Sequence, residues 1–288
     1  MSGAPSIAVA VATTGGERTP SLRRCIEALS AGTTLPTLVL VVDQSGSDEL
    51  AESLGFFVGL RVEVVSQPRL GLAASRNLAL ERLSEGIVAV TDDDCMPDPG
   101  WLTAVAAAFA ADATLAAVTG PVLPLAADGE RTEPVSSRTR ADTALFDSRT
   151  APWHVGTGGN MAFERHRLGR RRFDVRLGAG TPGKAGEDLD MIDRLLADGE
   201  RIRYEPAAVV RHERQTPARR TASRYAYGHG VGALVGLGLR RRDARALVHL
   251  TGWLALRVRL AFAHRAFTDE LRVLAGTCGG LVYGLRAR

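Results

Sequence analysis

The sequence has few cysteines, and they are not arranged to hold a metal or a set of disulfides. Cys25, Cys95 and Cys278 are odd in number and far apart, and no CxxC pair occurs. The pattern therefore indicates neither a disulfide framework nor a zinc site. The first twelve residues also lack a basic region followed by a long apolar stretch, so we expect no signal peptide. A reducing cytoplasm is the expected location.

Long uncharged apolar runs are missing as well. Residues 231–239 and 246–263 are apolar, but the second stretch contains Arg257 and Arg259. Neither stretch offers the about 20 uncharged residues that a membrane span needs. Repeats and low-complexity segments are absent. Since 45% of the residues are hydrophobic and 24% are charged, the composition is that of a folded protein with a sizeable core.

Net charge is small, at +4, but it is unevenly distributed. Residues 214–288 carry 14 arginines against three acidic residues, a net charge of +11, which leaves −7 for residues 1–213. A basic, partly apolar tail predicts helices that lie on the anionic inner face of the cell membrane. Packing on the preceding domain, or a homodimer, is the alternative. Nucleic acid is the competing polyanion, but we do not expect it as a partner.

Apolar runs and helical patterns alternate along residues 1–213. Each short run is followed by a loop and an amphipathic segment, which predicts an α/β fold with a mostly parallel, doubly wound sheet. Glycines between 228 and 238 argue against a continuous helix in the tail. A long polar segment at 126–152 is of the kind that is functional or mobile. The expected strands are 7–11, 38–42, 62–65, 87–90, 118–122, 202–204 and 207–210, and the expected helices begin near 19, 48, 71, 101 and 187.

Three carboxylates end the apolar run 87–90. Asp92 and Asp94 are spaced i and i+2 on an extended backbone, so both can face one hard divalent cation that also takes phosphate oxygens. Asp93 adds a third adjacent negative charge, and such a group repels itself unless a cation is near. Ligands bind at the carboxyl ends of strands in open α/β sheets. The cluster therefore indicates handling of a metal diphosphate. Asp98 is predicted to be a plain N-cap before Pro99.

Four features in order make the chain resemble the family 2 glycosyltransferases of bacterial type. They are Asp43 at the end of the second strand, the helix start 71–77, the Asp92–Asp94 cluster and the Gly186-Glu187-Asp188 sequence. The resemblance covers roughly residues 5–213 and implies a GT-A fold, the Rossmann-like fold of nucleotide-diphospho-sugar transferases. We therefore expect a GT-A domain at 1–213 and a helical extension at 214–288.

The resemblance implies a donor site for a nucleotide-diphosphate sugar. Asp43 would hold the base, with Thr13, Thr14 and Arg18 nearby, although a turn-forming aspartate is the alternative. Asp92 and Asp93 would contact the donor. Arg76 would contact the diphosphate or serve a structural role, with a solvated charge on an amphipathic helix as the alternative, and Asn77 could equally be part of the packing of that helix. Asp94 would bind Mg2+ or Mn2+, and His212 would join it or contact the leaving diphosphate, with a simple surface residue as the alternative for His212.

The resemblance also implies an inverting transfer to an acceptor hydroxyl. Asp188 would be the general base and Glu187 would position the acceptor or the base; a contribution to the helix dipole is the alternative for both. The acceptor, a sugar, a lipid-linked group or a small molecule, would meet Gly158, Gly159 and Asn160. Trp153 and His154 would stack on it or bond to it, and packing is the alternative for the aromatic residue beside Pro152. Two other functions stay open: a catalytically silent membrane or nucleic-acid binding module, and a sugar nucleotidyltransferase. The second would usually show a better phosphate loop than residues 15–18.

Overall fold

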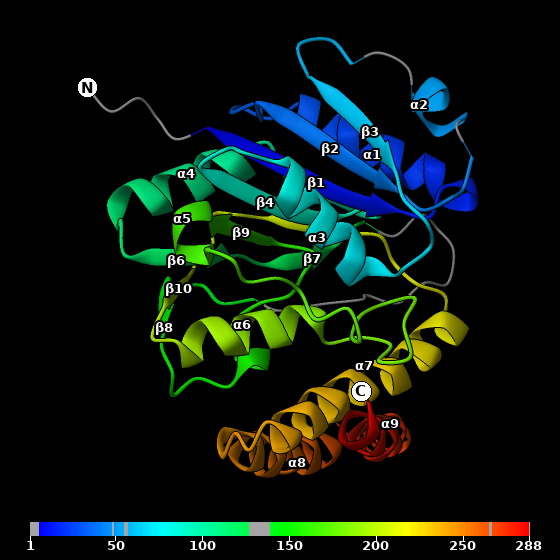
Figure 1. Ribbon diagram of the computed structural model, residues 1–288, viewed down its shortest axis with the longest axis vertical. Coiled ribbons are helices and arrows are strands. Elements are labelled where there is room, and N and C mark those ends of the chain that lie inside the picture. Colours follow the sequence, from blue (N-terminus) through cyan, green and yellow to red (C-terminus); the bar gives the residue numbers. More distant parts are fainter. Residues whose placement is uncertain (1–5, 48, 55–56, 127–138, 265–266, 288) are drawn as a thin grey trace.

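The structure is a computed structural model that describes residues 6–47, 49–54, 57–126, 139–264 and 267–287 (Figure 1). Its strands are β1 (Ile7–Thr13), β2 (Leu38–Asp43), β3 (Val62–Ser66), β4 (Ile87–Asp92), β5 (Cys95–Pro97), β6 (Leu115–Thr119), β7 (Val122–Pro124), β8 (Ala144–Phe146), β9 (Met161–Glu164), β10 (Arg201–Tyr204) and β11 (Val210–His212). Its helices are α1 (Thr19–Ser30), α2 (Glu49–Leu54), α3 (Leu72–Arg82), α4 (Trp101–Ala111), α5 (Arg165–Leu168), α6 (Glu187–Ala197), α7 (Pro217–Arg240), α8 (Arg245–His264) and α9 (Phe267–Arg286), with 3-10 turns η1 (Gly16–Arg18) and η2 (Pro152–His154).

The predicted α/β fold with a mostly parallel sheet is confirmed. Within the described residues the main sheet has the order β3-β2-β1-β4-β9-β6-β10-β8. Strands β3, β2, β1 and β4 run parallel, whereas β9 is antiparallel to both of its neighbours and β8 is antiparallel to β10. Thr13 pairs with Asp43 and Ala12 pairs with Asp92. The polar carboxyl-terminal ends of β1, β2 and β4 therefore lie next to one another.

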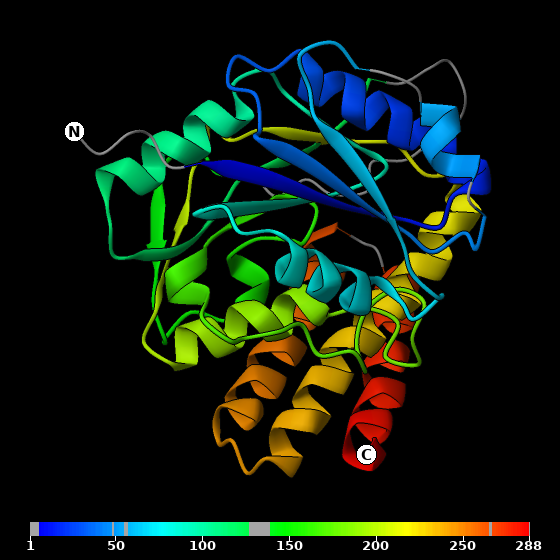
Figure 2. The ribbon, with the colours of Figure 1, turned by 45° about the horizontal axis from the view of Figure 1, so that its top comes forward.

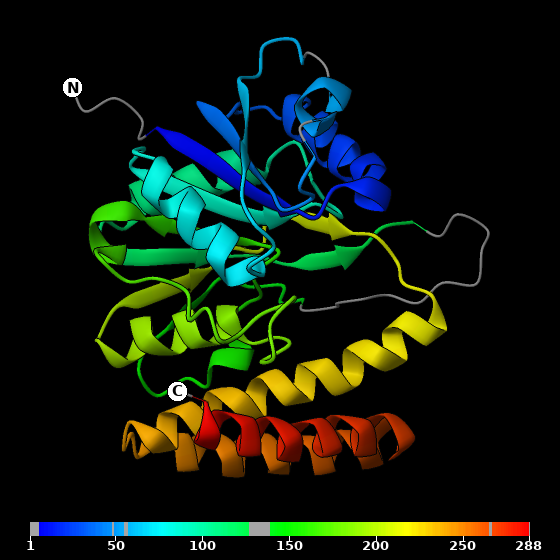
Figure 3. The same ribbon diagram turned by 45° about the vertical axis from the view of Figure 1, so that its right-hand side comes forward.

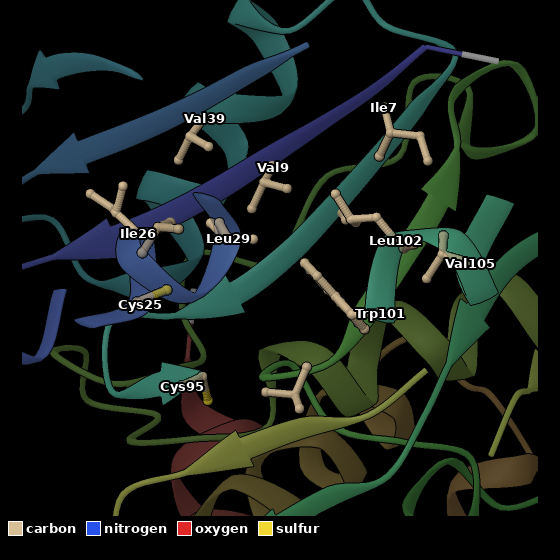
Figure 4. Close-up of a cluster of buried hydrophobic side chains, with 14 of the residues drawn as sticks. Ile7, Val9, Cys25, Ile26, Leu29, Val39, Cys95, Trp101, Leu102 and Val105 are labelled. Atoms are coloured by element: carbon tan, nitrogen blue, oxygen red, sulfur yellow. The ribbon is translucent and has the colours of Figure 1, made fainter. Parts of the chain in front are cut away.

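Helices cover both faces of this sheet (Figure 2). Alternate residues of the central strands point to opposite sides: Val9 and Val39 pack with α1 and α4, and Ala10 and Leu40 pack on the side of α3 and α6. The first of these two cores is drawn in Figure 4, where the side chain of Trp101 extends beneath the strands. Burial on both faces explains why the strands read as unbroken apolar runs and not as alternating ones.

A second sheet has three strands in the order β5-β11-β7. Its strands β5 and β7 follow directly after the carboxyl ends of β4 and β6. The predicted strand 118–122 is divided between β6 and β7, because the backbone at Gly120 meets that of Ala208: a Cβ there would lie 2.1 Å from the Ala208 carbonyl oxygen. The predicted strand 207–210 is displaced toward the C-terminus, where β11 covers Val210–His212. The polar segment 126–152 contains β8, and its residues 127–138 lie outside the described part of the chain.

The predicted N-cap role of Asp98 is wrong. Helix α4 begins at Trp101, with Gly100 as its N-cap residue, so Asp98 lies two residues too early to cap it with its side chain. Its carboxylate instead accepts two hydrogen bonds from Arg211 of β11, at 2.8 and 3.0 Å. This bidentate pair fastens the small sheet to the loop before α4.

The predicted C-terminal helices are present, as a layer of three beneath α6 (Figure 3). The expectation that glycines interrupt the first of them is wrong, because α7 is continuous. Gly228, Gly232 and Gly236 of α7 face α9, where a Cβ on Gly280 would lie 1.9 Å from the His229 carbonyl oxygen. The glycines let two helix backbones touch, and this packing outweighs their low helix propensity.

One described helical segment, Arg245–Ala263 in α8, is long and apolar enough to cross a membrane when judged by length and composition alone. From the sequence we did not expect a membrane span here, because the stretch contains Arg257 and Arg259. Only 22% of the apolar window is buried inside the protein.

Candidate active site

Arg18 and two aspartates form the first part of the site, at the carboxyl ends of β1 and β4. Asp93 is 3% exposed and accepts hydrogen bonds from Thr13 Oγ1 at 2.8 Å and from Arg18 Nε at 3.0 Å. Arg18 Nη2 also lies 3.1 Å from Asp94 Oδ2. Burial by itself would lower the pKa of Arg18, but its bond to Asp93 and the charge of Asp94 raise it overall. Arg18 is therefore a fixed positive charge beside two carboxylates.

Asp94 lies against His212, as the resemblance implied for a metal pair. The β5–β11 pairing sets His212 opposite Cys95, and His212 Nε2 lies 3.3 Å from Asp94 Oδ1. One ligand atom from each of Asp94, Cys95 and His212 lies within 4.8 Å of the others. Burial, and then the charges of Asp92 and Asp94, raise the pKa of the Cys95 thiol well above its ordinary value. A hard cation prefers the oxygen and nitrogen donors of Asp94 and His212 to the sulfur of Cys95.

Arg76 connects this cluster to the start of α6. Its side chain, which comes from α3, is 3% exposed, and its two terminal nitrogens bond Asp92 Oδ1 and Glu187 Oε1, each at 2.8 Å. Nη2 also donates to the Gly158 carbonyl oxygen at 3.0 Å. One guanidinium thus joins three segments that are far apart in sequence. Its burial contradicts the solvated-charge alternative and agrees with the structural role expected for Arg76.

The loop before β9 lies against this guanidinium with no room for side chains. A Cβ on Gly158 would lie 2.5 Å from Arg76 Nη1, and one on Gly159 would lie 3.2 Å from Asp92 Oδ2. The amide nitrogen of Gly158 donates to Asp188 Oδ2 at 2.7 Å. The loop therefore carries the link from Asp92 to Asp188 through its backbone.

Glu187 and Asp188 differ in environment although they are adjacent. Glu187 is 5% exposed and paired with Arg76, whereas Asp188 is half-buried. Burial, and then the charge of Asp188, raise the pKa of Glu187 to about 7, against the opposing effect of Arg76. Asp188 accepts from the amide nitrogens of Gly158 and Leu189. Of the two, Asp188 has the carboxylate that solvent can reach.

Asp43 takes part in a turn. It is 1% exposed, and it accepts from the Ser45 amide at 2.8 Å and from Ser45 Oγ at 2.7 Å, which is the turn-forming alternative. Gly15 lies against this turn, since a Cβ on it would be 2.6 Å from Ser45 Cβ. Thr14 is exposed in the same loop. The first loop and the end of β2 therefore form one continuous rim.

Two residues expected on the acceptor side are used for packing. Asn160 is 1% exposed; its Nδ2 donates to the carbonyl oxygens of Pro121 and Ala208, and its Oδ1 accepts from Trp101 Nε1. Its amide has no group left to offer an acceptor. Trp153 is 6% exposed, and its ring packs on Trp253 of α8 at 5.3 Å between centroids. These contacts correct both expectations.

His154 and Asn77 have different surroundings. His154 is exposed and lies beside the Trp153 indole, whose Nε1 donates to its Nε2 at 3.2 Å. Asn77 both donates to and accepts from the Phe173 backbone, which is the packing role considered for it.

Two contacts at the site gave no signal in the sequence. Cys95 joins the Asp94–His212 pair only through the pairing of β5 with β11. Helix α7 forms a wall of the loop before α6: His229 Nδ1 lies 3.2 Å from the Gly183 carbonyl oxygen, and a Cβ on Gly230 would lie 2.5 Å from the Ala185 backbone. The tail therefore contacts the segment that leads into Glu187.

Comparison with known sequences gives one family. The sequence profile described as "Glycosyl transferase family 2" matches residues 10–170, more than half of the chain. Pre-mycofactocin glycosyltransferase from two strains of Mycobacterium tuberculosis is 32% identical over 227 residues, which are 76% of this chain and 46% of the relative. The chain thus spans about half the length of the curated relatives it matches.

Solved structures show the same fold. The mannosyltransferase PcManGT from Pyrobaculum calidifontis, in complex with GDP-Man and Mn2+, matches with a TM-score of 0.64 and 20% identity, over 99% of this chain and 88% of that one. S. aureus TarS 1–349 matches with a TM-score of 0.63 and 15% identity, over 98% and 81%. Its complex with UDP-GlcNAc gives 0.61 and 15%, over 80% and 65%. The matches to PcManGT and to TarS 1–349 without ligand cover nearly the whole chain, so the likeness includes the region of the C-terminal helices.

Proposed function

Because the chain belongs to glycosyltransferase family 2, we propose that it transfers a sugar from a nucleotide-diphosphate sugar to an acceptor hydroxyl, with a divalent cation and with inversion at the anomeric carbon. One observation carries the proposal. A cation-suited pair, Asp94 and His212, is linked through Asp92, Arg76 and Gly158 to Asp188, a carboxylate open to solvent. Donor and base functions thus belong to one connected site.

The residues present fit a hard cation. His212 Nδ1 lies 2.7 Å from the Glu213 carbonyl oxygen, which can only accept, so Nδ1 carries the proton. Nε2 lies on the opposite side of the ring and faces Asp94 Oδ1 at 3.3 Å. In the neutral imidazole this nitrogen and the carboxylate oxygen are close enough to bind one cation together, and carboxylate oxygen is the donor that Mn2+ and Mg2+ prefer. Such a cation would supply neutralisation of the leaving diphosphate.

The donor would occupy the rim between the first loop and the acidic cluster. Arg18, held by Asp93 and Asp94, offers a fixed cation there, and Thr13 fixes Asp93. The Asp43 turn lies next to this loop, so we place the nucleoside against it. A donor of this class agrees with the relatives, since one binds GDP-Man and another binds UDP-GlcNAc.

Asp188 would take the proton of the acceptor hydroxyl. Its two oxygens each accept one backbone N–H, which fixes the carboxylate and leaves further lone pairs for a hydroxyl. Glu187 is engaged by Arg76, so we assign it to positioning. Gly158 and Gly159 let the backbone approach the reacting groups. The acceptor would be a sugar, a lipid-linked group or a small molecule, met in the cytoplasm.

Calorimetry would test the donor and metal parts of this proposal. UDP, GDP and dTDP are each titrated, with Mn2+ and with EDTA, into the wild type and Asp94→Ala. We expect one nucleotide to bind in a metal-dependent way and the variant to lose that binding. Binding of none of them, or binding unaffected by EDTA and by the substitution, would contradict the assignment and favour a catalytically silent module.

A further inference from the structure

The outer side of the helical tail is apolar although it faces solvent. On α8, the exposed large hydrophobic residues recur at helical spacing, and two of them are mostly uncovered: Val248 is 69% exposed and Phe262 is 71% exposed. Leu247, Leu254 and Val258 continue the same side of the helix. Helix α8 therefore presents a stripe that an ordinary soluble surface helix would fill with charged residues.

Helix α9 continues this surface. Its exposed large hydrophobic residues are Phe267, Leu271, Val282 and Leu285. Helices α8 and α9 contact each other, and in Figure 3 α9 lies in front of α8 on the side of the molecule farthest from the main sheet. Phe262 and Phe267 contact each other across the α8–α9 connection, with ring centroids 5.5 Å apart. We call the exposed hydrophobic side chains of α8 and α9 the outer tail face. Many exposed large hydrophobic side chains on two helices that contact each other mark an interaction site.

The charged side chains of this face are mostly basic. Among the described residues of α8 and α9, Arg259, Arg272 and Arg286 are exposed, whereas Asp269 is partly exposed and pairs with Arg272 and Arg224. Arg240 and Arg242 are also exposed, in the turn that leads into α8. Basic residues around an apolar helical face match a surface of anionic lipid, which takes the apolar side chains below its headgroups.

From this combination we propose that the outer tail face docks the protein on an anionic membrane surface, with α8 and α9 lying in the plane of the membrane. A transmembrane orientation of α8 would break its buried contacts. Trp253 Nε1 donates to Thr277 at 3.0 Å, and His249 Nε2 lies 2.8 Å from Asp193 Oδ1. The buried pair Arg257–Glu270 holds α8 to α9 as well. The helix therefore binds lipid with its outer side only.

A second copy of the chain fits this face less well. In a two-fold dimer the same patch would meet itself, so the exposed arginines of one subunit would face arginines and apolar side chains of the other. Asp269, the partly exposed carboxylate of α9, already pairs with Arg272 and Arg224 of its own chain. Lipid phosphates supply the missing negative charge.

Vesicle co-sedimentation of the full chain would test the docking. Vesicles of phosphatidylcholine alone are compared with vesicles that also contain phosphatidylglycerol. We expect the wild type to sediment with the anionic vesicles, and the double variant Phe262→Ser with Phe267→Ser to bind about tenfold or more weakly, since two exposed aromatic rings no longer enter the lipid. Leu145→Ser and Val58→Ser, which remove exposed hydrophobic residues outside the tail, serve as controls and should bind as the wild type does.

The charge part of the proposal has its own variant. Reversal of Arg259 and Arg286 to Glu should abolish the preference for anionic over neutral vesicles while the circular dichroism spectrum stays unchanged. Absence of sedimentation with either vesicle would overturn the proposal. So would a stable dimer in analytical ultracentrifugation that the Phe262/Phe267 double variant dissociates, because that result would assign the face to a second copy. None of these measurements requires turnover, so their outcome is independent of whether the proposed reaction is correct.

Discussion

Replacement of Arg76 by methionine would expose the energetic role of the central ion-pair network. Methionine keeps much of the length of the side chain and removes its charge. Glu187 would then be buried with no cation, since it is 5% exposed and its described ion-pair partner is Arg76. Loss of one partner of a buried pair costs about 3–5 kcal/mol of unfolding free energy, because the remaining charge is uncompensated. We expect a loss in that range at alkaline pH.

The loss should depend on pH, with a sign that follows from the raised pKa of Glu187. Its folded-state pKa is about 7 and its ordinary value is 4.5, so the folded state holds a proton that the unfolded state has released between these values. This contribution to stability is present below pH 4.5 and is lost as the pH rises to 7. Without Arg76 the pKa rises further, and the decline extends to higher pH. The difference between wild type and variant should therefore be smaller near pH 6, where it reflects the lost bonds to Asp92 and Gly158, and larger above pH 8.

Urea unfolding at several pH values measures this difference. Arg61→Met is the control, because the Arg61 side chain is 70% exposed and its removal should cost within about 0.5 kcal/mol. Adding Glu187→Gln to Arg76→Met should recover part of the stability at alkaline pH, since the buried charge is gone. A loss that is equal at both ends of the pH range, or below about 1 kcal/mol throughout, would refute the reasoning.

Other predictions concern single contacts. Asp188→Asn keeps size but removes basicity, so turnover should disappear while nucleotide binding, measured by calorimetry, is retained; surviving turnover would mean that another group is the base. His212→Ala should weaken Mn2+ binding by about tenfold or more in a titration with the metal alone, and unchanged affinity would remove His212 from the metal site. Gly280→Ala brings a Cβ to 1.9 Å from the His229 carbonyl oxygen and should lower the melting temperature. Gly252→Ala, on α8 with only an ordinary 3.8 Å contact, should raise stability by up to about 1 kcal/mol; equal effects of the two would show that the α7–α9 backbone contact is not tight.

The strands and the acidic edge were predictable because their signal is local. Buried parallel strands are apolar throughout, and the carboxylates at Asp92–Asp94 stand out where such a run stops. The same local pattern gave the wrong role for Asp98, because an Asp-Pro sequence is identical whether the carboxylate caps a helix or pairs with Arg211. The partner lies more than a hundred positions away and leaves no mark near Asp98.

The functions of Asn160, Trp153 and Arg76 were beyond sequence reasoning for a related reason. Each is polar or aromatic and lies in a segment that suits a binding loop or an exposed helix. Only the fold shows that Asn160 bonds three separate segments, that Trp153 packs under α8, and that Arg76 is buried between two carboxylates. The continuity of α7 was missed similarly, because the propensity of glycine says nothing about a second helix placed against it.

The contact between Gly230 and the Ala185–Gly186 backbone has a consequence for how this chain can be taken apart. A cut after residue 213 would look like a clean removal of an appendage, yet it would strip one wall from the peptide that sets the direction of Glu187 and Asp188. An exchange of tails between relatives would meet the same obstacle, since any incoming helix would need a residue without a side chain at this one point. We therefore expect residues 214–288 to fold together with residues 1–213 as a single unit, and not as an interchangeable module.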